Sequence, residues 1–329
     1  MRLSFLLLAV FLTWSAHAQF APQAGQPGST AIPAGSPLIK GWATRSTVTL
    51  GWLDIRNKSL GTVAFGLDTN GTGPADGTLV SLGDSGVVVL EFAVPIADGP
   101  GADLAVFENG FLNPADSQQA YLELAFVEVS SDGSHFFRFP VQALADTTAQ
   151  VAGTGTYLDC RKYHNLAGTY RSGFGTPFDL SDLPNHVLLN KSRITHVRLV
   201  DVIGSIGPEG SRDAAGRKIN DPFPTAFNTG GFDLDGVAVL HDETSQRIQT
   251  LLSGIVVRIA PNPATDWLSV DVPGIPFEYE LLHLDGRPAA SGSAEGQVRI
   301  PVAALPEGLY WIQLKTREGE SWCEKIWVR

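Results

Sequence analysis

Acidic residues stand inside or directly beside the apolar runs of this chain, where a protein core rarely carries them. Paired carboxylates in such a setting repel one another unless a cation, a proton or a basic side chain lies between them. Calcium takes about six to eight oxygen ligands from carboxylates, Asn side chains and backbone carbonyls. The alternative is that these acids are separate turn caps and solvated strand ends. The residues for which we predict a calcium site are Asp103, Glu108, Asn109, Asp201, Asp221, Asp233 and Asp235.

A second oxygen-rich loop runs from Asp68 to Asp76. Its oxygen-bearing residues fall at loop positions one, three, five and nine, with glycine at six, as in an EF-hand loop. Position twelve, where the EF-hand has a bidentate acid, is Leu79, and no flanking helices are expected. The favoured interpretation is therefore a glycine-rich turn.

The tetrapeptide from Gly83 to Gly86 has the same sequence, Gly-Asp-Ser-Gly, as the nucleophile loop of trypsin-like proteases. Those enzymes need a histidine upstream of the serine. The only histidine ahead of Ser85 is His17, inside the expected signal peptide. We interpret the tetrapeptide as a turn that leads into a buried strand.

Other catalytic patterns are incomplete. The remaining histidines lack the close spacing of zinc ligand pairs, and no phosphate-binding or dinucleotide-binding fingerprint is present. Glycoside hydrolysis needs only two carboxylates roughly 5–10 Å apart. Glu108, Glu123 or Glu128 together with an aspartate are candidates for such a pair, although acids are common and the pattern is not specific. Whether the protein is an enzyme stays open, with binding favoured over catalysis.

Aromatic residues near the expected loops favour carbohydrate binding. Rings at one edge of a sandwich stack on sugar faces, while polar ring tips bond to sugar hydroxyls. For any single ring, packing beneath a long loop is the favoured interpretation. The candidates are Trp42, Trp52, Tyr157, Tyr163, Tyr170, Phe174 and Phe178.

Short strands must position these side chains. Apolar runs bounded by Gly, Pro, Asp and Ser predict strands over 87–92, 103–107, 121–129, 136–139, 194–202 and 232–240. The pair Asp132 and Gly133 predicts a hairpin. Because strand side chains alternate, Glu108 shares a face with Leu104 and Val106. The pattern predicts an all-β protein.

Composition and the N-terminus indicate an exported protein. The 329 residues include 34 acids and 23 Lys or Arg, a net charge of −11 that argues against nucleic acid or an anionic membrane surface as partner. Residues 1–18 have the charged start, apolar run and small-residue cleavage site of a signal peptide. The apolar run is too short to span a bilayer. Two cysteines, Cys160 and Cys323, do not make a disulfide scaffold.

Composition also divides the chain. Residues 19–41 are rich in Pro, Gly, Ala and Ser, which predicts a flexible lead-in. Residues 42–245 carry the strands above and form the expected cargo domain, followed by a linker over 246–254. Residues 255–329 contain about six or seven short apolar runs, with turn signals roughly every 8–12 residues. That spacing is typical of a small sandwich.

Four segments near the C-terminus follow in a fixed order: Pro261–Ala264, Leu284–Gly286, Leu305–Tyr310 and Lys325–Val328. With them, residues 255–329 resemble the C-terminal sorting domain of the type IX secretion pathway of Bacteroidota. The resemblance implies a small Ig-like β-sandwich that the secretion machinery recognises at the outer membrane and usually cleaves. The cargo is then released or attached to surface lipopolysaccharide. Trp327 departs from the pattern, because a smaller aliphatic residue is usual there.

Motifs of a second kind lie between residues 42 and 241: Ser81–Asp84, Gly101–Phe111, Glu123–Gly133, Asp201–Gly204, Ile219–Pro224 and Gly231–Asp235. Through them this region resembles a family of exported bacterial cell-surface proteins. The resemblance implies a secreted, jelly-roll-like β-sandwich and no particular activity.

These observations favour a secreted or surface-displayed binding module for a glycan or another extracellular ligand. We expect it to be stabilised by Ca²⁺ and exported through residues 255–329 by the type IX secretion machinery. The alternatives are a polysaccharide-acting hydrolase and a structural envelope protein. Neither nucleic acid nor a membrane span is expected.

Overall fold

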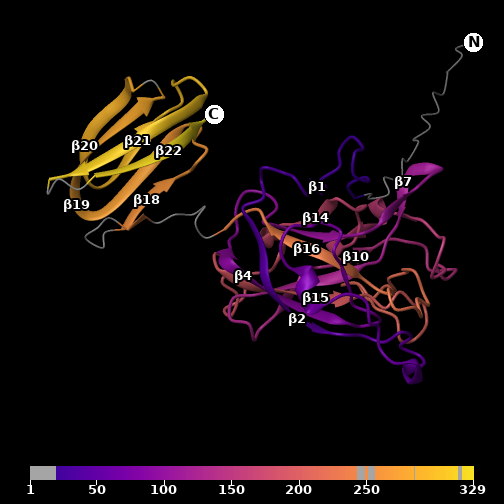
Figure 1. Cartoon of the computed structure of the whole chain (residues 1–329). Coiled ribbons are helices and arrows are strands. Elements are labelled where there is room, and N and C mark those ends of the chain that lie inside the picture. The colour runs from indigo at the N-terminus through magenta and orange to yellow at the C-terminus, as the bar shows by residue number, and fades with distance from the viewer. Residues whose placement is uncertain (1–19, 243–248, 251–255, 285, 318–320) are drawn as a thin grey trace, which may run out of the picture. The chain divides into compact units, whose positions relative to one another are not determined.

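The computed structural model describes residues 20–242, 249–250, 256–284, 286–317 and 321–329 (Figure 1). The chain forms two compact units, an N-terminal one that ends at Glu243 and a C-terminal one that begins at Thr244. Each has its own hydrophobic core. The helical segments among the described residues are short 3₁₀ turns: η1 (Lys58–Leu60), η2 (Asp68–Gly71), η3 (Cys160–Lys162) and η4 (Leu180–Asp182). The predicted all-β class is confirmed.

The N-terminal unit is built on an antiparallel sheet that turns back on itself at one strand. In spatial order its strands are β1 (Ile32–Pro33), β14 (Phe174–Phe178), β5 (Leu104–Glu108), β16 (Asp233–Val239), β2 (Gly41–Thr49), β4 (Val87–Ile96), β15 (Ile194–Asp201), β8 (Ala125–Ser130) and β13 (Leu166–Ala167). Two short strands flank this path, β3 (Val80–Ser81) beside β16 and β9 (Phe137–Arg138) beside β8. Strand β2 joins the two halves, since its start pairs with β16 and its remainder with β4.

The two halves of this sheet face each other across one core. Alternate residues of β5 and β16 on one side and of β4, β8 and β15 on the other form a single buried cluster. Burying each Val or Leu side chain contributes roughly 1.5–3 kcal/mol relative to exposure. Smaller sheets lie outside this core: β10 (Gln142–Ala143) with β12 (Tyr163–His164), and β11 (Leu158–Asp159) with β7 (Asp116–Tyr121) and β6 (Phe111–Asn113).

The predicted strands are present, and one of them is interrupted. The hairpin at Asp132 and Gly133 joins β8 to β9, with Glu128 opposite Arg138. Strand β8 begins at Ala125, later than the apolar pattern predicts. Just before it, the Leu124 N–H donates to the Asp221 side chain, and the Leu124 carbonyl accepts from Val202. The interruption ties the start of β8 to the loop that follows β15.

Residues 20–41 pack against the N-terminal unit, which differs from the flexible lead-in that their composition predicts. Strand β1 pairs with β14, with Ile32 opposite Gly175. Gln23 is buried; its Nε2 donates to the Thr169 carbonyl at 3.2 Å, and its Oε1 accepts from the Arg171 N–H at 3.1 Å. Pro and Gly prevent regular structure here, yet irregular backbone is ordered where its polar groups find partners. Composition alone does not reveal such partners.

The C-terminal unit is a second antiparallel sheet structure. Its strands are β17 (Gln249–Thr250), β18 (Val256–Ala260), β19 (Trp267–His283), β20 (Pro288–Pro301), β21 (Gly308–Thr316) and β22 (Ser321–Val328). Strands β19 and β20 are longer than the sequence predicts. The register of β19 against β20 shifts between Val272 and Pro276; before the shift β19 pairs with β18, and after it with β21. The single strand β19 therefore pairs with β18 over its first part and with β21 over its last part, whereas the turn signals in the sequence predict only short strands.

Within the described ranges, no helix is long and apolar enough to cross a membrane. Both cysteines are free; Cys160 is buried and Cys323 is exposed.

Candidate functional site

Six carboxylates gather at one end of the N-terminal sandwich, and we call this group the acidic end. Glu108 and Asp201 are the last residues of β5 and β15, and Asp233 is the first residue of β16. Because β5 and β16 are antiparallel, with Glu108 opposite Leu234, their acids meet at the same edge. The register of Asp201 opposite Ala125 brings the residues before β8 to this edge too. The members of the acidic end are Asp84, Glu108, Glu123, Asp201, Asp221 and Asp233, all buried.

Two of these acids hold backbone segments in place. Asp201 accepts from the Phe232 N–H at 2.8 Å through Oδ1 and from the Ser85 N–H at 3.0 Å through Oδ2. Gly231 lies against the same carboxylate with φ of 75°, and a Cβ there would come within 2.8 Å of Asp201 Oδ1. Asp84 Oδ2 accepts from the Ile55 N–H at 2.7 Å. The backbone thus approaches these carboxylates closely, and glycine is required at position 231.

The acids of β5 and β16 are linked through Asn109. Its Nδ2 donates to Asp233 Oδ2 at 2.9 Å, while Asp233 Oδ1 accepts from the Ser81 hydroxyl. Glu108 Oε2 accepts from the Gly110 N–H at 2.7 Å. These bonds fix the carboxylates without neutralising their charge.

Each of the remaining two acids has a buried oxygen without a hydrogen-bond partner. Asp221 Oδ2 accepts from the Leu124 N–H at 3.0 Å, but its Oδ1 has no hydrogen-bond partner. Glu123 Oε1 is likewise buried without a partner. No Lys, Arg or His forms an ion pair with any acid of the acidic end among the residues the structure describes. Unpartnered buried oxygens are rare in proteins, and each calls for an explanation.

Burial raises the pKa of every carboxyl group in the acidic end, and repulsion between its members adds to the rise for Glu108, Glu123, Asp201 and Asp221. Burial raises the pKa of Asp84 and of Asp233 to about 6. For Glu123, burial raises the pKa well above its ordinary value, and the charges of Asp233 and Glu108 add to the effect. Acids from both halves of the sheet therefore lie close enough to influence one another's pKa. Burial likewise holds the pKa well above the ordinary value for Glu108, Asp201 and Asp221.

These shifts predict how stability depends on pH in the presence of a chelator. A carboxyl group whose pKa is higher in the folded than in the unfolded state contributes stability at low pH, and the contribution is lost as pH rises through the folded pKa. This loss of stability begins near pH 4, the ordinary pKa of a carboxyl group, and continues through about pH 6, the folded-state pKa of Asp84 and Asp233. The charged or titratable neighbours are Tyr121, Asp235, Asp54, Arg56 and Glu209.

We therefore expect the melting temperature in EDTA to fall by roughly 5–10 °C between about pH 5 and about pH 7.5. Differential scanning calorimetry of the exported chain measures this directly. A melting temperature that stays level or rises over this interval would contradict the prediction.

The structure brings together five of the seven predicted ligands and separates two. Glu108, Asn109, Asp201, Asp221 and Asp233 lie at the acidic end. Asp235 instead accepts from the N–H groups of Asp76 and Gly77, at 3.1 and 2.9 Å, and so holds the oxygen-rich loop. Asp103 lies apart from them, and its Oδ1 accepts from the Gly99 N–H at 2.7 Å and from His241 Nδ1 at 2.9 Å.

Glu123 and Asp84 are not among the residues predicted to bind a metal ion. Glu123 has the same parity as Ala125, Val127 and Val129, all of which are buried in the core. Extending that alternation two residues upstream of the strand would have identified Glu123. The position of Asp84 depends on a turn whose geometry the sequence does not reveal.

The other two sequence candidates are turns. In the loop from 68 to 78, Asn70 Nδ2 donates to the Leu79 carbonyl at 2.8 Å and Asp76 Oδ1 accepts from the Thr78 N–H at 2.8 Å. Ser85 has a positive φ of 61° and lies two residues before the start of β4. Both arrangements agree with the favoured interpretations.

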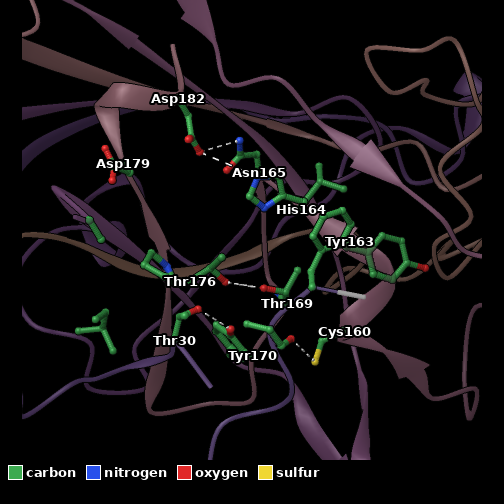
Figure 2. A pocket seen from close by; sticks show the side chains of 16 residues that line it. Thr30, Cys160, Tyr163, His164, Asn165, Thr169, Tyr170, Thr176, Asp179 and Asp182 are labelled. Carbon is green, nitrogen blue, oxygen red and sulfur yellow. Dashed lines mark hydrogen bonds and ion pairs between the residues drawn. The ribbon is translucent and has the colours of Figure 1, made fainter. Parts of the chain in front are cut away.

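A cavity of about 420 Å³ lies between residues 20–32 and the segment from Cys160 to Asp182 (Figure 2). The ring of Phe20 stacks on the ring of His164, with centroids 4.8 Å apart and planes inclined by 16°. Asn165 Nδ2 donates to Asp182 Oδ2 at 3.1 Å, and His164 Nε2 lies 4.0 Å from the same oxygen. Figure 2 shows Asp179 and Asp182 on one side of the cavity and Thr30 and Tyr170 on the other.

Two of the seven candidate aromatic residues line this cavity, Tyr163 and Tyr170. Phe178 is buried in the main core, and Trp42 packs against Phe107 with centroids 5.2 Å apart. These two rings therefore pack against other side chains of the protein, as the favoured interpretation predicts. The stacked pair of Phe20 and His164 is not among the candidates, because Phe20 belongs to the expected lead-in.

The motifs of the C-terminal unit contact one another. Asn262 Oδ1 accepts from the Trp327 N–H at 2.9 Å, and Asn262 Nδ2 donates to the Lys325 carbonyl at 3.0 Å. The Ala264 N–H donates to the Trp327 carbonyl at 2.8 Å. The segment Pro261–Ala264 thus extends the hydrogen bonding along β22. Trp327 is 42% exposed, so its large ring displaces no core residue where a smaller one is usual.

Among solved structures, the chain is similar to a β-glucuronidase from Ruminococcus gnavus, with 14% identity, 88% of this chain and 44% of that chain covered, and a TM-score of 0.23. It is similar to the BSP domain of a biofilm associated protein, with 11% identity, 88% and 52% covered, and a TM-score of 0.21. A β-glucuronidase from Lactobacillus rhamnosus gives 15% identity, 75% and 36% covered, and a TM-score of 0.18. The chain thus spans about half or less of these proteins, and similarities this low carry no functional argument.

No curated protein matches the chain. A family model does match part of it: residues 258–329 fit the secretion system C-terminal sorting domain. This confirms the resemblance predicted from the four C-terminal segments. A domain of this kind indicates export followed by attachment to the cell surface or secretion. The chain is therefore an exported protein that carries a type IX secretion C-terminal sorting domain at residues 258–329.

Proposed function

We propose that the N-terminal unit is an extracellular binding module for a neutral glycan, and that the cavity of Figure 2 receives the sugar. The observation that carries the proposal is the stacked pair of Phe20 and His164 beside the polar rim formed by Asn165 and Asp182. The sorting domain delivers this module to the outside of the cell, where polysaccharides are available.

The chemistry of the cavity suits a sugar. Aromatic faces pack against the C–H face of a pyranose, while carboxylate and amide groups bond to its hydroxyls. The cavity volume of about 420 Å³ lies within the range of roughly 300–1,000 Å³ that is usual for small-molecule sites. Asp179 and Asp182 both line the cavity, and their negative charge disfavours an acidic sugar. A neutral glycan is therefore the expected class.

A glycan array probed with the exported chain, followed by calorimetric titration of the strongest oligosaccharide, tests this proposal. We expect His164→Ala to weaken binding by about tenfold or more, because it removes one of the stacked rings. His186→Ala is the matched control: His186 also packs against an aromatic ring, Phe137, with centroids 4.8 Å apart, but it does not line the cavity.

Equal affinity in the parent and in His164→Ala would move the binding site elsewhere, and an array without any hit would remove the glycan altogether. Release of a shorter sugar from a bound oligosaccharide would instead support the hydrolase. Chromatography of the incubated oligosaccharide distinguishes binding from turnover.

A further inference from the structure

We propose that the acidic end binds a divalent cation of the calcium type, with Glu123 and Asp221 as its principal carboxylate ligands. This site uses none of the residues that line the glycan cavity, so the two proposals stand or fall separately.

The starting observation is the pair of unpartnered oxygens. Glu123 Oε1 and Asp221 Oδ1 are buried without any hydrogen-bond partner, and their residues are only 6% and 3% exposed. A buried carboxylate oxygen without a donor costs the full desolvation penalty of that group. Each of the two acids lies near enough to Glu108 for their charges to repel. The unused oxygens therefore belong to one crowded group of negative charges.

Elsewhere the chain neutralises buried acids with arginine. Glu128, which is 4% exposed, accepts from Arg138 Nε at 2.8 Å and also from Arg198 Nε. Asp213 is paired with Arg217, with Arg217 Nη2 at 2.6 Å from Asp213 Oδ2. The acidic end is denser in acids than either of these places, and none of its acids forms an ion pair with a Lys, Arg or His among the described residues. A bound cation would balance these charges where no basic side chain does.

The donor set indicates which cation fits. The side-chain donors at the acidic end are carboxylates and the Asn109 amide, which are hard oxygen ligands, and no Cys or His belongs to the group. Hard oxygen sites favour Ca²⁺ or Mg²⁺ over zinc or copper. Calcium tolerates irregular geometry and backbone carbonyl ligands, whereas Mg²⁺ requires a near-ideal octahedron. Backbone lies close to the carboxylates at this end of the sandwich, since a Cβ at Gly110 would come within 3.0 Å of Glu108 Oε2 and one at Gly231 within 2.8 Å of Asp201 Oδ1.

A different trio of acids is geometrically tighter. The ligand oxygens of Asp98, Asp103 and Asp179 lie within 4.8 Å of one another, and no other group of three or more His, Cys, Asp or Glu in the described part of the chain does so. Both oxygens of Asp103 are already occupied, since Oδ2 accepts from the Leu180 N–H at 2.8 Å and Oδ1 from Gly99 and His241. At the acidic end no three carboxylate oxygens of different residues lie within 4.8 Å of one another, so an ion that binds there would draw the carboxylates inward.

Calorimetric titration of CaCl₂ into the EDTA-treated exported chain tests the site. We expect saturable binding with a dissociation constant on the order of 10⁻⁵–10⁻³ M, together with a higher melting temperature in calcium than in EDTA. The double variant Glu123→Gln with Asp221→Asn keeps the side-chain shapes and removes two charges. It should bind Ca²⁺ at least about tenfold more weakly and lose the melting response. Melting in EDTA verifies that it folds; if it does not, Glu123→Gln alone takes its place.

Asp98→Asn is the matched control, because it removes one charge from the other acidic trio. It should leave the titration unchanged. The proposal is overturned if the parent chain gives no binding heat, if the charge-removing variants titrate like the parent, or if Asp98→Asn abolishes binding.

Discussion

Deletion of residues 244–329 is expected to abolish delivery of the N-terminal unit to the cell surface and leave it in the periplasm. The sorting domain lies within the deleted segment, and the N-terminal unit has its own core, which the deletion does not touch. The truncated chain should therefore fold but lack its export address. Cell fractionation combined with protease digestion of intact cells measures the outcome. The truncated chain should be almost completely protected from the protease.

The complementary experiment fuses residues 244–329 to a periplasmic reporter. The reporter should become accessible to protease on intact cells. A truncated chain that still reaches the surface, or a reporter that stays protected, would show that the address lies elsewhere.

Asp103→Ala is expected to destabilise the N-terminal unit by roughly 3–5 kcal/mol and to lower its melting temperature by about 10 °C or more. The Asp103 carboxylate is fully buried and accepts from the Gly99 and Leu180 N–H groups and from His241. Alanine would leave these donors without partners beside the start of β5. Thermal melting of the exported chain measures the loss.

Two further variants serve as controls for this prediction. Asp103→Asn keeps one acceptor oxygen and should be intermediate. Asp146→Ala removes an exposed carboxylate that accepts from the Thr148 N–H and hydroxyl, and its effect should be below about 1 kcal/mol. Because Asp103 lies apart from the acidic end, Asp103→Ala should keep the calcium-induced rise in melting temperature. A melting temperature close to that of the parent would contradict the structural role.

Much of the fold follows from local patterns in the sequence. Strands β4, β5, β15 and β16 are predicted within a few residues, because apolar alternation and flanking turn residues are local properties. The length of β19 is not predicted, since it continues through Gly274 and Pro276, which resemble a turn in sequence. The ordered lead-in is missed for a different reason: the partners of Gln23 lie almost 150 residues away.

The candidate site is only partly accessible to sequence reasoning. Strand parity places Glu108 on the core face, and the same reasoning would have added Glu123. That Asp221 joins these acids depends on a loop, whose path is set by long-range bonds such as that from the Leu124 N–H. Asp103 has the same residue type and a similar apolar setting, but it is surrounded by backbone donors. The sequence pattern cannot distinguish an acid that clamps backbone from one with an unused oxygen.

The most direct measurement for the cation site is a crystal structure of the exported chain grown with a lanthanide in place of calcium. Lanthanide ions prefer the same hard oxygen ligands, and their anomalous scattering locates them independently of the protein coordinates. We predict an anomalous peak between Glu123 and Asp221 at the acidic end, with the previously unpartnered oxygens turned toward it. An acidic end without a peak, or a peak only beside Asp98 and Asp179, would contradict this account.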